Sequence, residues 1–139
     1  MSVLISVIVI ICGFIIGGLF KFKTQVLRNN LHMVFITRKD VSPGQMIEMS
    51  STAIVLLYKR NLSKRNKATL KFWERRREPK SFFYARDRIH LENCIAFAES
   101  IKIAHVVIRF KDSSPALVAI GPMGIKRTQK MTSGYEKIE

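Results

Sequence analysis

The chain has 139 residues and carries 24 Lys and Arg residues against 10 Asp and Glu residues, a formal net charge of +14. This length accommodates one domain and leaves no room for a second. Recurring aliphatic and aromatic residues exclude a disordered chain, and the excess positive charge favours an anionic partner such as nucleic acid or an anionic membrane surface.

A long apolar segment opens the chain. Residues 3–20 carry no charged side chain, and Lys21, Lys23 and Arg28 follow them. As a helix, this segment would be about 27 Å long, just enough to cross the hydrocarbon core of a bilayer. A cleaved signal peptide is the alternative, but it would carry its positive charges before the apolar run. We expect a retained membrane anchor over residues 1–22, with the domain on the cytosolic side.

Two glycines within this segment have the spacing of a helix-packing motif. Gly13 and Gly17 form a GxxxG pair, which allows two membrane helices to approach closely. A homodimer is therefore one arrangement to consider. Residues 23–31 are expected to form a linker, and residues 32–139 a folded domain.

Hydrophobic periodicity predicts alternating strands and helices in that domain. We expect strands at residues 33–37, 81–84, 105–110 and 116–120, helices at 45–59, 62–77 and 88–100, and a short helix before Tyr135. Pro79 ends the second helix, and Asp87 caps the third. Such alternation is typical of a mixed sheet covered by helices on both faces, an α/β fold.

The sequence contains no recognisable cofactor or metal motif. Cys12 and Cys94 are isolated, with no CxxC pair and no His nearby at ligand spacing. Glycine-rich phosphate loops and HExxH are missing as well. Isolated thiols are typical of a reducing compartment. We therefore expect no cofactor and no bound metal.

Basic residues are densest around the predicted second helix, where only Glu74 and Glu78 oppose them. Neutralising phosphates along such a segment releases counterions, so RNA is the favoured ligand. An exposed Phe72 or Trp73 ring would stack on a base. At helical spacing the alternative is that Leu70, Trp73 and Arg77 face the core. An anionic lipid surface and a merely solvated helix face are the alternatives. The candidate nucleic-acid contacts are Lys59, Arg60, Lys64, Arg65, Lys67, Lys71, Arg75, Arg76, Arg77 and Lys80.

Four short motifs, in this order, resemble those of the type II peptidyl-tRNA hydrolases. Residues 33–40 (MVFITRKD) are similar to the opening strand of that family, MVLVVRxDL. Residues 70–80 look like its LxxWxxxGxPK stretch. Residues 119–122 match its AIGP strand, and residues 132–137 are similar to its VTGxLKL ending. The family also has members with an N-terminal membrane anchor.

The resemblance implies a three-layer α/β/α sandwich on a four-stranded mixed sheet. It also implies hydrolysis of the ester between a peptide and tRNA, with peptidyl-tRNA or tRNA as partner and no cofactor. Together with the short anchor and the basic residues after it, it favours the outer mitochondrial membrane. The endoplasmic reticulum is the alternative.

The sequence departs from the family at both places where the catalytic groups lie. In the KxGKxxAQxxHA motif, Met49 and Thr52 stand at the Gln and His positions, and Gln45 is the nearest polar substitute for the missing lysines. The DAGxTxxxxGS hairpin is shortened to residues 109–116, where Asp112 is the one candidate catalytic residue. We therefore expect weak or lost activity. A non-enzymatic tethered module that binds RNA, anionic lipid or a protein is the alternative.

Overall fold

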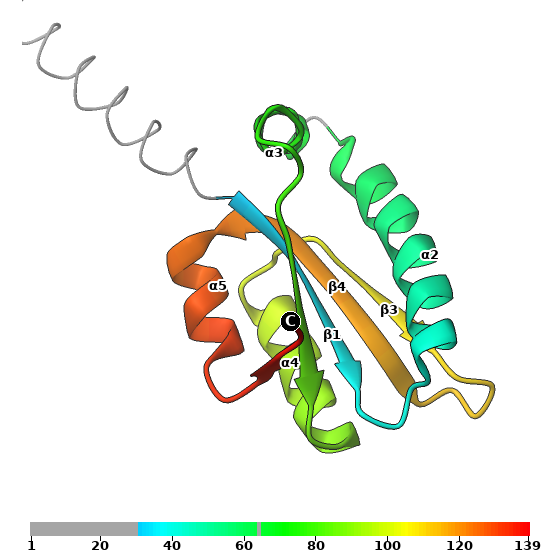
Figure 1. Cartoon of the computed structure of the whole chain (residues 1–139). Helices are drawn as coiled ribbons and strands as arrows, with labels where there is room; N and C mark the ends of the chain where they lie inside the picture. The colour runs from blue at the N-terminus through cyan, green and yellow to red at the C-terminus, as the bar shows by residue number, and fades with distance from the viewer. Residues whose placement is uncertain (1–30, 64) are drawn as a thin grey trace, which may run out of the picture. The chain divides into compact units, whose positions relative to one another are not determined.

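The computed structural model describes residues 31–63 and 65–139, so the predicted anchor over residues 1–22 lies outside the described residues. Within the described residues, no helix has the length and apolar character needed to cross a membrane. The elements are β1 (Leu31–Arg38), α2 (Pro43–Asn61), α3 (Lys67–Arg75), β2 (Lys80–Ala85), α4 (Arg88–Ser100), β3 (His105–Arg109), β4 (Pro115–Gly124), α5 (Ile125–Thr132) and β5 (Glu136–Lys137) (Figure 1).

The strands form one mixed sheet in the order β3-β4-β1-β2-β5. β1 and β2 run parallel, and the other pairings are antiparallel. The predicted alternation of strands and helices is confirmed, but the prediction of four strands was wrong. The fifth strand, β5, contributes only Glu136 and Lys137, which pair with Tyr84 and Phe83. Two residues are too few to show a strand period in the sequence.

Helices cover both faces of the sheet, because alternate side chains of β1 belong to different cores. Val34 and Ile36 pack in a cluster with residues of α4 and α5. Met33 and Phe35 pack in a second cluster with residues of α2 and α3. Figure 1 shows α2 on one side of the sheet and α4 and α5 on the other. Since both faces are buried, β1 reads as a continuous apolar run.

The first two helices differ from the predicted boundaries, and particular contacts explain where they begin and end. Ser42 and Gln45 form a reciprocal capping box that starts α2 at Pro43, two residues before the predicted start. Its other end is held by Asn61, whose Nδ2 donates to Gly121 O at 2.8 Å. The next helix begins at Lys67, five residues later than the sequence predicted, because residues 62, 63, 65 and 66 lie in turns and a bend.

The two ends of β1 lie next to different parts of the chain. At its amino end, Met33 N donates to Pro79 O at 3.1 Å, which places the end of α3 there. At its carboxyl end are the start of α2 and the turn between β3 and β4, where Arg109 pairs with Pro115. We call the first region the amino end and the second the hydrolase end, because the resemblance to the peptidyl-tRNA hydrolases implies the catalytic groups there. Eight residues of β1 separate them by about 23 Å.

Candidate functional site

The hydrolase end is organised around Arg38, the last residue of β1. Its Nε donates to Asp40 Oδ1 at 2.9 Å, and its Nη2 contacts the other oxygen of the same carboxylate. Its Nη1 donates to Ser114 Oγ at 3.4 Å, and its guanidinium carbon lies 5.2 Å from the centroid of the Phe110 ring. The one cation that β1 brings to this end is thus engaged by a carboxylate and by the β3–β4 turn.

Asp112, the predicted catalytic residue, is exposed in that turn. Its Oδ1 accepts hydrogen bonds from Ser114 Oγ at 2.7 Å and from Ser114 N at 2.9 Å. These bonds, the side-chain one first, hold the pKa of Asp112 below its ordinary value, and the positive charges of Arg88 and Arg38 add to the effect. A carboxylate with a lowered pKa is a weaker base. Asp112 lies at the expected end of the sheet, and its catalytic role stays a prediction.

The start of α2 contributes hydroxyl and amide groups but no cation. Gln45 Oε1 accepts from Ser42 N at 3.1 Å, so this side chain is used in the helix cap. The hydroxyls of Ser51 and Thr52 bond back to carbonyls one turn earlier in the same helix. Met49 is partly buried against the core beneath α2. Residues 43–52 contain no Lys, Arg or His, so this helix places no positive side chain at the hydrolase end.

The basic residues predicted to bind nucleic acid lie mainly around α3, close to the amino end. Lys67, Lys71 and Arg75 are spaced four residues apart and are exposed, so they form one side of the helix, which we call the α3 basic face. The guanidinium carbon of Arg75 lies 6.0 Å from the centroid of the half-buried Phe72 ring. Lys59, Arg65, Arg76 and Arg77 are exposed in the adjoining chain, and Lys64 lies outside the described residues.

Other side chains of the predicted RNA-binding segment make contacts within the domain. Trp73 is 1% exposed and its Nε1 donates to Pro79 O at 3.0 Å, so the idea that this ring stacks on a base was wrong. Lys80 Nζ lies 5.2 Å from the centroid of the Trp73 ring and 3.2 Å from Glu78 Oε2. Arg60 Nη1 donates to His105 O at 2.6 Å. Trp73 therefore holds α3 against β2, and Arg60 joins α2 to β3.

The end of α3 forces an arginine into a backbone conformation that favours glycine. Arg77 N donates to Glu74 O and Glu78 N donates to Trp73 O, both at 3.2 Å, which is the hydrogen-bond pattern of a Schellman motif. Arg77 has φ 63° and Glu78 has φ 54°. A side chain in this left-handed region costs about 1–2 kcal/mol. Arg77 is also one of the predicted RNA contacts. Because neither Arg77 nor Glu78 is a glycine, the sequence gave no sign of this left-handed turn.

The fold and these two regions define a mixed α/β domain with a polar turn at one end of its sheet and a cationic helix at the other. Among residues 31–63 and 65–139 there is no group of three or more His, Cys, Asp or Glu side chains that could hold a metal ion. The family model described as "Peptidyl-tRNA hydrolase PTH2" matches residues 31–138, and the chain belongs to this family. A comparison with curated proteins finds no match.

Proposed function

We propose that the protein is a membrane-anchored peptidyl-tRNA hydrolase family member that binds tRNA or peptidyl-tRNA and hydrolyses the ester weakly or not at all. Family membership supports the substrate class. The observation that carries the loss of activity is the arrangement at the hydrolase end. There, Arg38 is paired with Asp40, Asp112 is hydrogen-bonded to Ser114, and the first ten residues of α2 bring no cation.

Ester hydrolysis requires a base to activate water and a positive group near the developing oxyanion. Asp112 is a poor base because its pKa is lowered, and Asp40 is neutralised by Arg38. Arg38 is the cation that β1 brings to this end, but its three guanidinium nitrogens already have partners. Loss of one acid–base group lowers the rate by about 10² to 10⁴. A weakened base and an engaged cation together support the proposal of weak or absent turnover.

Binding of tRNA rests on the α3 basic face. Lys67, Lys71 and Arg75 project from one side of a nine-residue helix, close enough to neutralise neighbouring phosphates. This face lies close to the amino end, which the length of β1 separates from the hydrolase end by about 23 Å, so a ligand that engages both must extend along the sheet. A folded RNA is long enough to do so, and its 3′ end would then lie near Arg38 and Asp112.

The membrane anchor and its location are proposed from the sequence. Residues 3–20 are uncharged and are followed by basic residues, which supports insertion with the domain in the cytosol, where tRNA is found. The outer mitochondrial membrane is the proposed location, with the endoplasmic reticulum as alternative, and Gly13 and Gly17 offer a route to a homodimer. Resistance of the full chain to alkaline extraction from purified organelles tests the anchor; extraction into the soluble fraction would contradict it.

The activity is tested with the full-length protein in detergent micelles and a purified peptidyl-tRNA. Release of peptide and binding of tRNA are measured on the same sample, the latter across a salt series. We expect little or no release together with strongly salt-dependent binding. Release at the rate of an intact family member would refute the proposed loss of activity, and absence of tRNA binding would refute the proposed ligand.

A matched pair of triple variants assigns the RNA contact. Replacing Lys67, Lys71 and Arg75 by Gln removes three charges from the α3 basic face. Replacing Lys126, Arg127 and Lys130 by Gln removes three exposed charges from α5. The first variant should lower the salt slope by roughly 2 to 3, and the second should leave it nearly unchanged. Equal effects would show that only the net charge of the protein matters.

A non-enzymatic module that binds RNA, lipid or a protein is the second candidate function. The same contacts at the hydrolase end, between Arg38 and Asp40 and between Asp112 and Ser114, favour it. It differs from the first candidate only in having no hydrolase activity at all. A rate indistinguishable from the uncatalysed rate, with tRNA binding retained, selects it over a weak hydrolase.

A further inference from the structure

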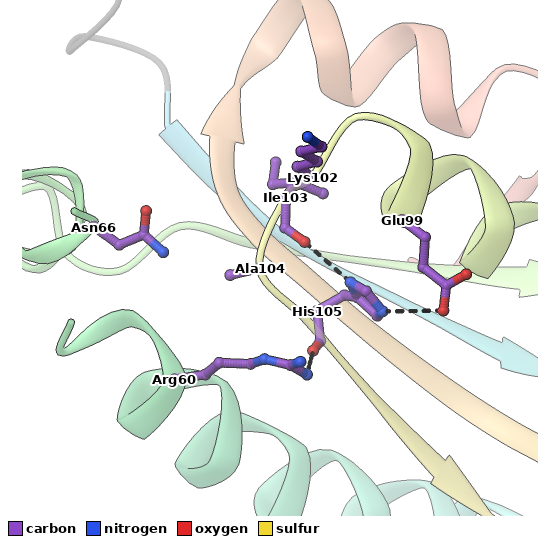
Figure 2. Close-up of a pocket in the computed structure, with 7 residues that line it drawn as sticks. All are labelled: Arg60, Asn66, Glu99, Lys102, Ile103, Ala104 and His105. Atoms are coloured by element: carbon purple, nitrogen blue, oxygen red, sulfur yellow. Dashed lines mark hydrogen bonds and ion pairs between the residues drawn. The ribbon is translucent and has the colours of Figure 1, made fainter.

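An open recess of about 440 Å³ lies where the end of α2 and the start of α3 face the connection from α4 to β3 (Figure 2). Arg60 and Asn66 line it from one side, and Glu99, Lys102 and His105 line it from the other. Arg60 is fixed at its wall by the 2.6 Å hydrogen bond from Nη1 to His105 O, and its guanidinium has donors on two further nitrogens. None of the residues placed at the hydrolase end lines the recess.

The recess lies at the amino end of the sheet, beside the α3 basic face. Its lining residue His105 pairs with Ile120, which pairs in turn with Val34 in the first half of β1. Asn66 comes directly before Lys67, which is both the first residue of α3 and the first cation of the α3 basic face. The nine residues of α3 extend this face over about 13 Å. The recess therefore adjoins the row of cations on which the proposed tRNA binding rests.

Side chains from both faces of the sheet meet at the recess. The helices α2 and α3 pack on one face and α4 packs on the other. Arg60 and Asn66 come from the first pair, whereas Glu99 and Lys102 come from the end of α4. Lys102 lies outside the basic segment of residues 59–80, so the sequence gave no reason to count it among the RNA contacts. An anion in the recess would contact cations from both layers.

Lys102 has a backbone conformation that is unfavourable for lysine. Its N donates to Glu99 O at 2.9 Å, and Ile103 N donates to Ala98 O at 3.1 Å. This is again the Schellman pattern, and Lys102 has φ 52° in the position that glycine normally takes. The attraction of a lysine to the carbonyl end of a helix is smaller than the cost of a left-handed side chain. A strained residue that brings a cation to a recess points to a function for that cation.

The lining groups suit a phosphate that belongs to a longer chain. Arg60 and Lys102 supply two positive charges, and Glu99 is the one carboxylate among the lining residues. Asn66 adds an amide that makes no capping bond in α3. A small free ligand favours an enclosed pocket that buries most of its surface. An open recess beside a cationic helix instead admits one phosphate of a polynucleotide while the neighbouring phosphates follow the helix.

We propose that this recess binds a backbone phosphate of the tRNA, with Arg60 and Lys102 as its cationic contacts and Asn66 as a neutral donor. The inference rests on the proposed function and extends the RNA contact from the α3 basic face to the end of α4. A tRNA that runs along α3 is then held by cations from both faces of the sheet, so two separate contacts set its orientation on the domain.

The test measures binding of tRNA to the full-length protein in dodecylmaltoside micelles across a salt series. Each phosphate contact contributes roughly 0.7 to 0.9 to the slope of log affinity against log salt. Lys102→Gln should lower the slope by this amount and weaken binding about five- to eightfold at about 0.1 M salt. Lys102→Gly should weaken binding equally without lowering the melting temperature, because glycine relieves the left-handed backbone. Glu99→Gln should strengthen binding about threefold.

Lys130→Gln is the matched control, because Lys130 is an exposed cation in the last turn of α5 and does not line the recess. Equal losses in Lys130→Gln and Lys102→Gln would overturn the recess as a site, since only net charge would then matter. Unchanged tRNA binding in Lys102→Gln would overturn this inference and leave the proposed function standing, whereas no tRNA binding by the unchanged protein would overturn both. Weaker binding of dihexanoyl phosphatidic acid by Lys102→Gln, with tRNA binding unchanged, would assign the recess to a lipid headgroup instead.

Discussion

The left-handed arginine at the end of α3 allows a change that should raise stability and lower RNA affinity together. Replacing Arg77 by Gly removes a backbone cost of about 1–2 kcal/mol from the folded state. The greater chain entropy of glycine stabilises the unfolded state by roughly 0.5–1 kcal/mol, which offsets part of this gain. The hydrogen bonds of the Schellman motif use only backbone groups, so they persist in the variant. The net gain is about 0.5–1 kcal/mol, which corresponds to a rise in melting temperature of about 2–4 °C for a domain of this size.

The assay is thermal unfolding followed by circular dichroism, paired with tRNA binding at low salt. Arg76→Gly is the matched control, because it removes the same charge from the neighbouring residue, whose φ is −98° and which gains nothing from glycine. We expect Arg77→Gly to be more stable than Arg76→Gly, and both to bind tRNA more weakly than the unchanged protein. A melting temperature for Arg77→Gly at or below that of Arg76→Gly would refute the argument from backbone strain.

Three further predictions follow from other parts of the fold. Gly121→Ala should destabilise the domain by about 2 kcal/mol or more, because φ is 113° and the added Cβ would lie 2.8 Å from His32 O; Gly44→Ala, where no atom lies within 4 Å, should not. Burial raises the pKa of Cys94 from 9.0 to about 11, so the folded state holds this proton more tightly than the unfolded state. Its stabilising contribution is present below pH 9 and is lost as the pH rises to about 11; denaturant unfolding should show this decline, and Cys94→Ala should reduce it, the remainder coming from Tyr135, whose pKa burial also raises. Ser114→Ala should raise the pKa of Asp112 toward its ordinary value, measured by carboxyl carbon NMR; an unchanged pKa would mean that Arg88 and Arg38 set it.

Much of the fold was predictable because apolar periodicity reports burial directly. The residues of β1 and β4 form unbroken apolar runs, as expected for strands covered on both faces. The helix α4 was predicted with the same ends that it has, because Asp87 caps it and its apolar residues repeat at helical spacing. The end of α2 was missed because its determining contact is distant in sequence: the side chain of Asn61 bonds to Gly121.

The candidate site was less predictable for a related reason. In the sequence, residues 59–80 form one basic segment. In the structure some of these cations form the α3 basic face, whereas Arg60 bonds to His105 O and Lys80 lies over the Trp73 ring. Trp73 looked like a stacking ring, but its hydrogen bond to Pro79 O can form only once β2 is in place. The hydrogen bond from Arg60 of α2 to His105 O of β3 joins residues 45 positions apart, a proximity that no local pattern encodes.

The two helix ends that carry Arg77 and Lys102 have a consequence for anyone who engineers this protein. A consensus or stability-guided design would place glycine at both positions, since each is a left-handed helix terminus. Every such substitution would also delete a cation from the amino end of the domain. Selection for heat resistance alone would therefore yield variants that melt late but have fewer positive charges for the proposed anionic partners. A library built on this chain should screen binding in the same round as stability.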